Sequence, residues 1–191
     1  MVYYTASIKQ SVESVRKYSL VVFSVFYSKV MITEYVLSIL LVLTGSFAVK
    51  KEGLSILLIL LGCILFMNVD APAKYLANRV IDFFKGTFPI LHYCFHDDYL
   101  LISEKMTKIK YTDFIKLVED DDFFYLFQTK QYGIMIKKTS ISGNANNISF
   151  QDFISQKSDL TWGKPPTILS FNLKNIVQVF IKQDKYKGPR L

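Results

Sequence analysis

The chain has 191 residues, of which 51% are hydrophobic and 20% charged, and its formal net charge at pH 7 is +7. This length supports one domain of ordinary size together with a short membrane segment. The positive charge is spread too thinly to form the dense basic stripe of a nucleic-acid-binding protein, so we expect no nucleic acid among the partners. The two cysteines, Cys63 and Cys94, lie in segments of different character and are not placed to pair, which favours a reducing compartment.

Residues 1–29 are interpreted as an N-terminal interfacial segment. Residues 2–8, VYYTASI, have β-strand character, and residues 11–29 are rich in β-branched and aromatic side chains but lead directly into an apolar run. The tyrosine, phenylalanine and lysine residues at that junction are typical of a membrane interface. We therefore expect a helix within residues 11–29 that lies at the membrane or enters it.

Two apolar runs, at about 30–49 and 53–69, predict a transmembrane hairpin over residues 30–71. A spanning helix needs about 20 mostly apolar residues, and neither run has the polar face of a soluble amphipathic helix. The charges of Lys50, Lys51 and Glu52 are expected to mark the water-exposed turn between the two helices. The alternative is a buried helical hairpin in a soluble core, which would need a larger protein around it.

Small residues recur on one face of each apolar run. Ser38 and Gly45 are two helical turns apart, and so are Ser55 and Gly62. Membrane helices approach one another closely through such residues, so these faces predict contact within the hairpin or a homo-oligomer formed through it. The same residues are also simply common in membrane spans.

The lysine and arginine residues that flank the hairpin predict its orientation. Cytoplasmic loops carry an excess of these residues. The two flanks, which a hairpin places on one side, carry more of them than the turn, which has only Lys50 and Lys51. We therefore expect a multi-pass protein of the cell membrane with both termini in the cytoplasm. The flanking residues are Arg16, Lys17, Lys29, Lys74, Arg79 and Lys85.

Residues 72–86 are predicted to form an amphipathic connector helix. Asp70 can cap it, and Pro72 suits its first turn. Two placements of this helix are equally compatible with the sequence, on the bilayer surface or packed against the following domain. One face is polar and the other apolar, carried respectively by Lys74, Asn78, Asp82 and Lys85, and by Leu76, Val80, Phe83 and Phe84.

Residues 87–191 are predicted to form a cytoplasmic β domain with a basic tail. From Pro89 the hydrophobic pattern changes from period 3.6 to period 2. A short helix follows, with Ser149 as its cap and Asp152 in its first turn. Two closing strands are expected at TILSFNL and NIVQVFIK, beyond the break at Pro165 and Pro166. The earlier strands are expected at 90–96, 99–103, 107–111, 115–119, 123–128 and 132–137.

Several short motifs follow one another in residues 95–153. They are Phe95–Asp98, Ile109–Phe114, Asp122–Leu126 and Ile134–Lys138, followed by a helix with Phe150 and Phe153. Their order resembles the YcxB-like family of bacterial membrane proteins. The resemblance implies an α+β fold, in which a two-helix transmembrane hairpin precedes a small PH-like antiparallel β domain with a short C-terminal helix and extra strands. Lys137 departs from the pattern, since the family usually has proline there.

No catalytic or cofactor-binding motif is recognisable. The sequence contains neither a phosphate-binding loop nor a nucleophile elbow, so we expect no enzyme, no catalytic residue and no cofactor. His92, Cys94 and His96 alternate along one predicted strand, but neighbouring same-face residues diverge by about 7 Å and cannot readily close on one metal ion. The acidic run at 119–122 lacks the spaced oxygen ligands of a calcium loop and is expected to be a solvated turn.

The favoured function is a membrane-tethered, non-catalytic binding module. Its partner would be a membrane protein or anionic lipid headgroups, in addition to the bilayer that holds the hairpin. Two alternatives are self-immunity against a toxin or bacteriocin, and a two-span effector that permeabilises the membrane when its soluble domain senses a ligand. The binding surface is expected to comprise Lys105, Lys108, Lys110, Lys137 and Lys138.

Overall fold

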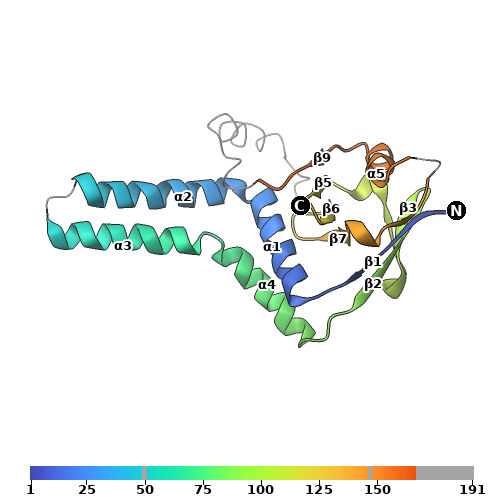
Figure 1. Cartoon of the computed structure of the whole chain (residues 1–191), viewed down its shortest axis with the longest axis horizontal. Helices are drawn as coiled ribbons and strands as arrows, with labels where there is room; N and C mark the ends of the chain where they lie inside the picture. The colour runs from blue at the N-terminus through green and yellow to red at the C-terminus, as the bar shows by residue number, and fades with distance from the viewer. Residues whose placement is uncertain (49–50, 146–147, 167–191) are drawn as a thin grey trace, which may run out of the picture. The chain divides into compact units, whose positions relative to one another are not determined.

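A computed structural model of the chain describes residues 1–48, 51–145 and 148–166. The described residues form two compact units, and Figure 1 shows the helices and strands of each. The sheet domain comprises Met1–Tyr18 and Arg79–Pro165, whereas the helical unit contains Ser19–Asn78. The chain therefore has the α+β class expected from its sequence.

Four helices account for residues 12–84. Within the described residues, the predicted spans at 30–49 and 53–69 are helical up to residue 48 and over 52–68, and the segment predicted as a connector, 72–86, is helical over 71–84. The long apolar stretch 28–47 is the one described helix that is long and apolar enough by itself to cross a membrane. The helices are α1 Val12–Phe26, α2 Ser28–Leu43 with the π-helical extension η1 Thr44–Ala48, α3 Glu52–Asn68 and α4 Ala71–Phe84.

Small residues lie where α2 and α3 contact each other. A Cβ atom added to Gly62 would lie 2.7 Å from the carbonyl oxygen of Ser38, and one added to Gly45 would lie 2.9 Å from that of Ser55. The hydroxyl of Ser55 donates a hydrogen bond to the carbonyl of Gly45. The two helices, called the helix pair below, are antiparallel, and only residues without large side chains permit this approach (Figure 1).

The sheet domain contains a five-stranded antiparallel sheet in the order β4-β3-β2-β1-β8. Its internal strand β1 pairs with β2 over nearly the whole length of both, with Ile8 opposite Leu91. Tyr4, Ala6 and Ile8 alternate with more exposed residues along β1 and point into the core. The strands are β1 Val2–Lys9, β2 Ile90–His96, β3 Tyr99–Ile102, β4 Thr107–Lys110 and β8 Ser142–Gly143.

A second sheet has the order β7-β6-β5-β9, in which β5 and β9 run parallel and the other pairs antiparallel. Helix α5 contributes Phe150, Phe153 and Ile154 to the core, and it begins where predicted, with the Ser149 hydroxyl accepting a hydrogen bond from the backbone N–H of Asp152. The elements are β5 Lys116–Glu119, β6 Phe123–Phe127, β7 Gly133–Lys137, α5 Phe150–Ser158 and β9 Trp162–Gly163.

The structure differs from the sequence-based domain boundaries at the N-terminus. Residues 1–29 were expected to be a separate interfacial segment, and the β domain was expected to begin at residue 87. Instead β1 is an internal strand of the first sheet, because its alternating apolar side chains complete the core beside β2. The parallel pairing of β5 with β9 also departs from the expected antiparallel arrangement. The two closing strands predicted beyond Pro166 lie outside the described residues.

Candidate functional site

A polar cleft of about 480 Å³ lies at one edge of the first sheet. Asp97 and Asp98 form the turn between β2 and β3, while Lys108 and Lys110 lie on the edge strand β4. The cleft therefore joins a hairpin turn, an edge strand and the end of a helix. The lining residues are Asp97, Asp98, Tyr99, Lys108, Lys110, Tyr111, Thr112 and Lys157.

Aromatic residues hold the cleft in shape. The buried Tyr111 donates a hydrogen bond of 2.7 Å from its hydroxyl to the carbonyl of His96, which fixes the chain just before the Asp97 turn. The ring of His96 stacks on Tyr99 with centroids 4.6 Å apart. The ammonium of Lys108 lies 4.9 Å from the centre of the same Tyr99 ring, within the range of a cation–π contact.

One ion pair crosses the cleft, between Lys157 at the end of α5 and Asp97 in the β2–β3 turn. The hydrogen bond and charge of Lys157 lower the pKa of the Asp97 carboxyl, and the same contact raises the pKa of Lys157. Burial, together with the charges of Asp97 and Asp98, raises the pKa of Tyr111. The two charged groups thus stay charged at neutral pH and the tyrosine stays neutral.

The opposite side of the cleft presents unpaired cations. Lys108 and Lys110 alternate on β4 with the buried Ile109, so both side chains lie on the exposed face of that strand. Neither ammonium forms an ion pair with another described residue. Thr112 is also exposed and adds a hydroxyl that can donate or accept a hydrogen bond. The cleft can therefore accommodate an anionic group between fixed ammonium charges.

The structure does not bring the five lysines of the predicted surface together in one site. Lys108 and Lys110 line the cleft, and Lys105 is exposed in the turn that precedes their strand. Lys137 is exposed at the end of β7, in the second sheet. Lys138 is engaged inside the domain, because its ammonium pairs with Glu119 at 2.7 Å and lies 4.7 Å from the centre of the Phe124 ring.

Lys157 and Thr112 were not among the residues proposed from the sequence. Lys157 lies 60 residues after Asp97, and only the packing of α5 carries it to the Asp97 turn. One local feature of the sequence did point to this contact. A lysine in the last turn of a helix lies near the end of the helix axis, where its side chain can pair with a neighbouring loop. Asp97 entered the sequence analysis only as part of the motif Phe95–Asp98.

The acidic run between β5 and β6 is a turn, as predicted, and its carboxylates are engaged. Asp120 accepts hydrogen bonds from the backbone N–H groups of Asp122 and Phe123 and from the hydroxyl of Tyr125. Lys17, at the start of α1, pairs with Asp120 at 3.2 Å and with Asp122 at 2.8 Å. These contacts hold the first part of α1, which belongs to the sheet domain, against the turn between β5 and β6.

The histidine and cysteine residues of β2 have other partners. His92 contacts Glu104 through both its ring and its backbone N–H, and the Cys94 thiol lies 3.9 Å from the Ser103 hydroxyl. Tyr93 and Phe95, between them, are buried in the core as expected. Among the described residues, no three histidine, cysteine, aspartate or glutamate side chains are grouped so that they could hold a metal ion.

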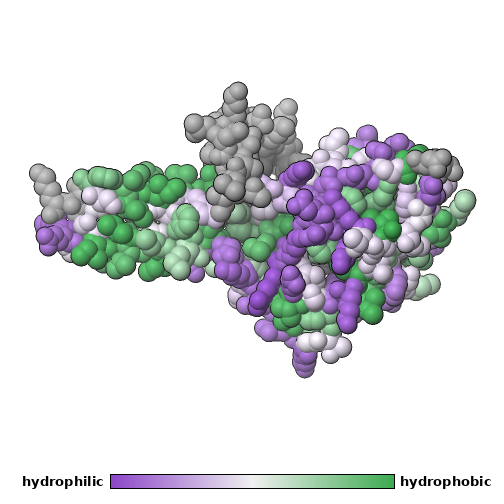
Figure 2. All heavy atoms as spheres, in the orientation of Figure 1, coloured by the Kyte–Doolittle hydropathy of each residue, from purple (hydrophilic) through white to green (hydrophobic). Residues whose placement is uncertain are grey.

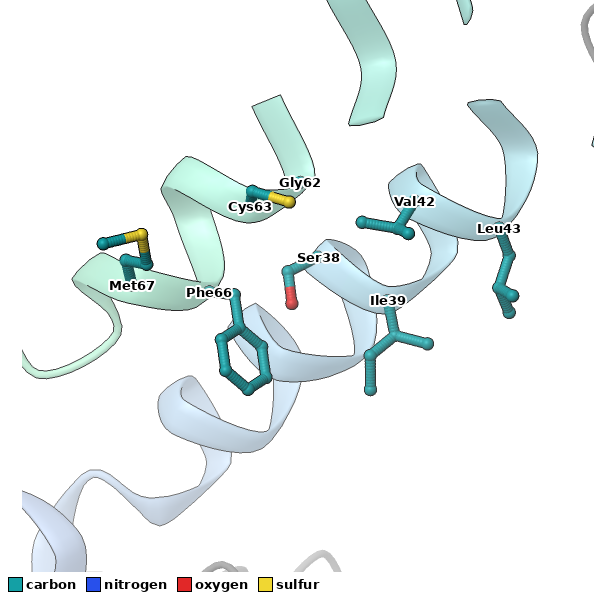
Figure 3. A pocket seen from close by; sticks show the side chains of 8 residues that line it. All are labelled: Ser38, Ile39, Val42, Leu43, Gly62, Cys63, Phe66 and Met67. Carbon is teal, nitrogen blue, oxygen red and sulfur yellow. The ribbon is translucent and has the colours of Figure 1, made fainter. Parts of the chain in front are cut away.

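A second hollow, of about 310 Å³, lies along the helix pair and is apolar (Figure 3). Ser38 from α2 and Gly62 from α3 form its floor, where the two helices come closest. Ile39, Phe66 and Met67 line its sides. It offers one hydroxyl and no charge, so it differs in chemistry from the cleft of the sheet domain.

One comparison with known proteins found a match. Residues 95–154 match the model of a family described as YcxB-like protein, so the resemblance noted in the sequence is confirmed for this segment. The segment runs from Phe95 in β2 to Ile154 in α5 and contains every residue that lines the cleft except Lys157. No curated protein and no solved structure matches the chain.

Proposed function

We propose that the chain is a non-catalytic binding module, tethered to the cell membrane by α2 and α3, whose cleft receives anionic headgroups or another anionic group at the membrane surface. The sheet domain lies in the cytoplasm in this proposal. The observation that carries it is the packing of the helix pair, in which small residues are buried and large apolar residues are exposed, combined with unpaired lysines in the cleft.

In the helix pair, small residues are buried and large apolar residues are exposed. Ser38 is only 1% exposed, whereas Leu40, Leu57 and Met67 are 53%, 58% and 75% exposed. Figure 2 shows a continuous apolar surface along these helices, with hydrophilic atoms at the end where they connect. Apolar patches of this extent mark contact with a membrane or another protein, and a bilayer solvates such side chains on every side.

The dimensions of the helices agree with a bilayer. The stretch 28–47 has 20 residues, which at 1.5 Å per residue is about 30 Å, the thickness of the hydrocarbon core. Only 17% of its most apolar window is buried, which argues against the core helix of a soluble protein. Helix α3, with 17 residues, is shorter and pairs with α2, and a span of this length is accommodated by local thinning of the bilayer.

The proposed orientation rests on the positive-inside rule. Lysine and arginine residues flank the helix pair on both sides, among them Lys17, Lys29, Lys74 and Arg79, and fewer lie in the turn that contains Lys51. With both ends of the pair in the cytoplasm, the sheet domain would lie on the side of the anionic cytoplasmic leaflet, which attracts basic surfaces close to it.

The charges of the cleft support binding rather than catalysis. A general acid or base is most effective when its pKa lies near the working pH. The pairing of Asp97 with Lys157 moves both pKa values away from neutrality, and the pKa of Tyr111 is also raised. Fixed ammonium groups at Lys108 and Lys110 are instead suited to phosphate oxygens, to which they can donate charge-assisted hydrogen bonds.

The test uses the full chain in nanodiscs of neutral phosphatidylcholine, because a fragment that begins near residue 86 would lack the internal strand β1. Dihexanoyl-phosphatidylglycerol, titrated below its micelle concentration, is expected to bind, and dihexanoyl-phosphatidylcholine much less. Lys108→Gln with Lys110→Gln should weaken binding about tenfold or more, since each lost charge-assisted hydrogen bond is worth about 1.5–3 kcal/mol before solvent screening. Calorimetry measures the affinity.

The matched control is Lys130→Gln with Lys164→Gln, which removes the same charge from exposed sites outside the cleft. It should leave the affinity unchanged. If both pairs weaken binding equally, the attraction is a general charge effect and the cleft is not the site. If neither lipid binds the wild-type chain, the lipid form of the proposal is wrong and a protein partner becomes the better account.

A further inference from the structure

Helix α4, Ala71–Phe84, carries an apolar stripe that the described protein leaves uncovered. Leu76, Val80 and Phe83 are four and three residues apart, so they lie on one side of the helix. They are 44%, 41% and 79% exposed, respectively. Ala73 and Ala77, on an adjacent side, are buried. The helix therefore packs through its alanines and keeps its larger apolar side chains free.

The opposite side of α4 is polar and the helix is basic overall. Asn78 and Asp82 lie on that side with Lys74, which pairs with Asp70 at 2.9 Å, one turn before it. Arg79 lies between the polar side and the apolar stripe, because the spacing of 3.6 residues per turn puts it about 60° from Leu76 around the helix axis. A basic helix with leucine, valine and phenylalanine on one side has the composition of an interfacial membrane helix.

We infer that α4 is an interfacial helix whose Leu76–Val80–Phe83 stripe inserts into the headgroup boundary of the leaflet from which α3 emerges. The inference rests on the proposed membrane anchorage. Two observations favour the bilayer as the partner that covers the stripe. Asn68, the last residue of α3, is separated from Ala71 by two residues, so the stripe begins where the chain leaves the hydrocarbon. The excess positive charge also complements anionic headgroups.

The angle between the two helices permits this placement. Helices α3 and α4 are bent by 43° relative to each other. Spanning helices are tilted by about 20° on average, so α4 would be inclined to the membrane plane by about 30° when the two angles add. Pro72 and Phe83 would then differ in depth by about 8 Å at 1.5 Å per residue, comparable with the depth of about 5–10 Å to which interfacial helices bury their apolar face. The charges of Lys74, Arg79 and Asp82 make insertion of α4 into the hydrocarbon itself costly.

The experiment places single spin labels on the full chain in nanodiscs that contain phosphatidylglycerol, with Cys63→Ala and Cys94→Ala to remove the native thiols. Leu76→Cys, Val80→Cys and Phe83→Cys report the stripe. Asn78→Cys and Asp82→Cys are matched controls on the other side of the same helix. At the stripe, collisions with lipid-soluble oxygen should exceed those with a water-soluble nickel chelate by roughly threefold or more, and the controls should show the reverse.

Equal nickel accessibility at the stripe and the controls would overturn the inference, because the stripe would then face water. Low accessibility to both reagents at the stripe would also overturn it, because the stripe would then be covered by protein. Spin labels at Leu40→Cys and Leu57→Cys test independently whether α2 and α3 lie in the bilayer. If those two positions favour oxygen and the stripe does not, the anchorage stands and only the interfacial role of α4 fails.

Discussion

In the sheet domain the largest side chains are the most deeply buried, whereas in the helix pair the smallest are. Tyr125, Phe95 and Phe127 are completely buried in the domain. Ser38 and Gly62 are buried between α2 and α3, and the leucines around them face outward. Both regions contain close contacts, but the sheet domain buries its largest side chains and the helix pair buries its smallest.

The proposed membrane anchorage would account for this difference. Water drives apolar area into the core of the sheet domain at about 25 cal/mol per Å². A bilayer gives no such force between helices, since lipid chains are as apolar as leucine, and close contact of backbones then decides the packing. An exposed leucine is therefore unfavourable in the sheet domain but expected in the helix pair. The same leucine-to-alanine substitution should accordingly destabilise the two regions to different extents.

The largest predicted effect compares one leucine from each region. Leu126→Ala in β6 should destabilise the sheet domain by about 2–5 kcal/mol, because a completely buried side chain leaves a cavity. Leu57→Ala in α3 should change the stability of the helix pair by less than about 0.5 kcal/mol, because that residue is 58% exposed in the described protein. The fluorescence of Trp162, which packs on Phe124, reports urea unfolding of the domain, and circular dichroism in dodecyl sulfate reports the helix pair. A large loss from Leu57→Ala would show that a protein surface covers it.

The next prediction concerns the contact between the helices. Gly62→Ala should destabilise the helix pair by about 1–3 kcal/mol, because the new methyl group would lie 2.7 Å from Ser38 O and Val42 Cγ2. Gly53→Ala, in the same helix but with no atom within 4 Å of its added methyl, should be neutral or stabilise by up to about 1 kcal/mol. Dodecyl sulfate unfolding measures both. If the two variants behave alike, the close approach of α2 and α3 is not what holds the pair together.

A smaller effect is predicted for the acidic turn of the sheet domain. Asp120→Asn should destabilise the domain by about 1–2 kcal/mol, because an amide replaces a carboxylate that accepts hydrogen bonds from Phe123, Asp122 and Tyr125. Asp121→Asn, at an exposed neighbouring position, is the control and should have almost no effect. Urea unfolding followed by Trp162 fluorescence gives both values.

The same carboxylate predicts an acid dependence. Burial raises the pKa of Asp120, but the hydrogen bonds from Tyr125, Phe123, Asp122 and Lys17 outweigh it, so the pKa in the folded state is lowered. The unfolded state then binds more protons, and the contribution to stability is present above about pH 4 and is lost as the pH falls below that value. Asp120→Asn should remove this part of the pH dependence. An unchanged acid profile in the variant would contradict the assignment.

The smallest predicted effect is that of Lys17. Its ammonium pairs with Asp120 and Asp122 and lies 4.6 Å from the centre of the Phe123 ring. Because the pair is partly exposed, Lys17→Met should cost at most about 1 kcal/mol at low salt and less at high salt. Arg16→Met, on the same helix, is the control. A loss that does not change with salt would indicate lost packing rather than a lost ion pair.

Local patterns in the sequence predicted the elements well, and long-range pairing was what they missed. Strands β2 to β7 begin and end within one or two residues of their predicted positions, since the alternation at Leu100 or Ile109 is a property of a few neighbouring residues. The pairing of Ile8 with Leu91 joins segments that are far apart along the chain. No local period encodes such a partner, although the alternation of Tyr4, Ala6 and Ile8 was visible.

The same distinction explains which site residues were found. Lys108 and Lys110 were identified because one strand places both on one face. Lys138 was assigned to the same surface, but it pairs with Glu119 across the second sheet, a contact that spacing along the chain does not reveal. Lys157 reaches the cleft only through the packing of α5.

The central claim is that α2 and α3 cross the membrane with the sheet domain in the cytoplasm, and thiol accessibility tests it most directly. In a Cys63→Ala, Cys94→Ala background, Lys51→Cys in the turn of the helix pair should react with a membrane-impermeant maleimide in intact cells. Lys130→Cys, exposed in the turn between β6 and β7, should react only after lysis. The reason is that a charged turn is too polar to rest in hydrocarbon. Reaction of Lys130→Cys but not Lys51→Cys in intact cells would contradict the orientation, and reaction of neither before lysis, with both reacting afterwards, would contradict the membrane crossing itself.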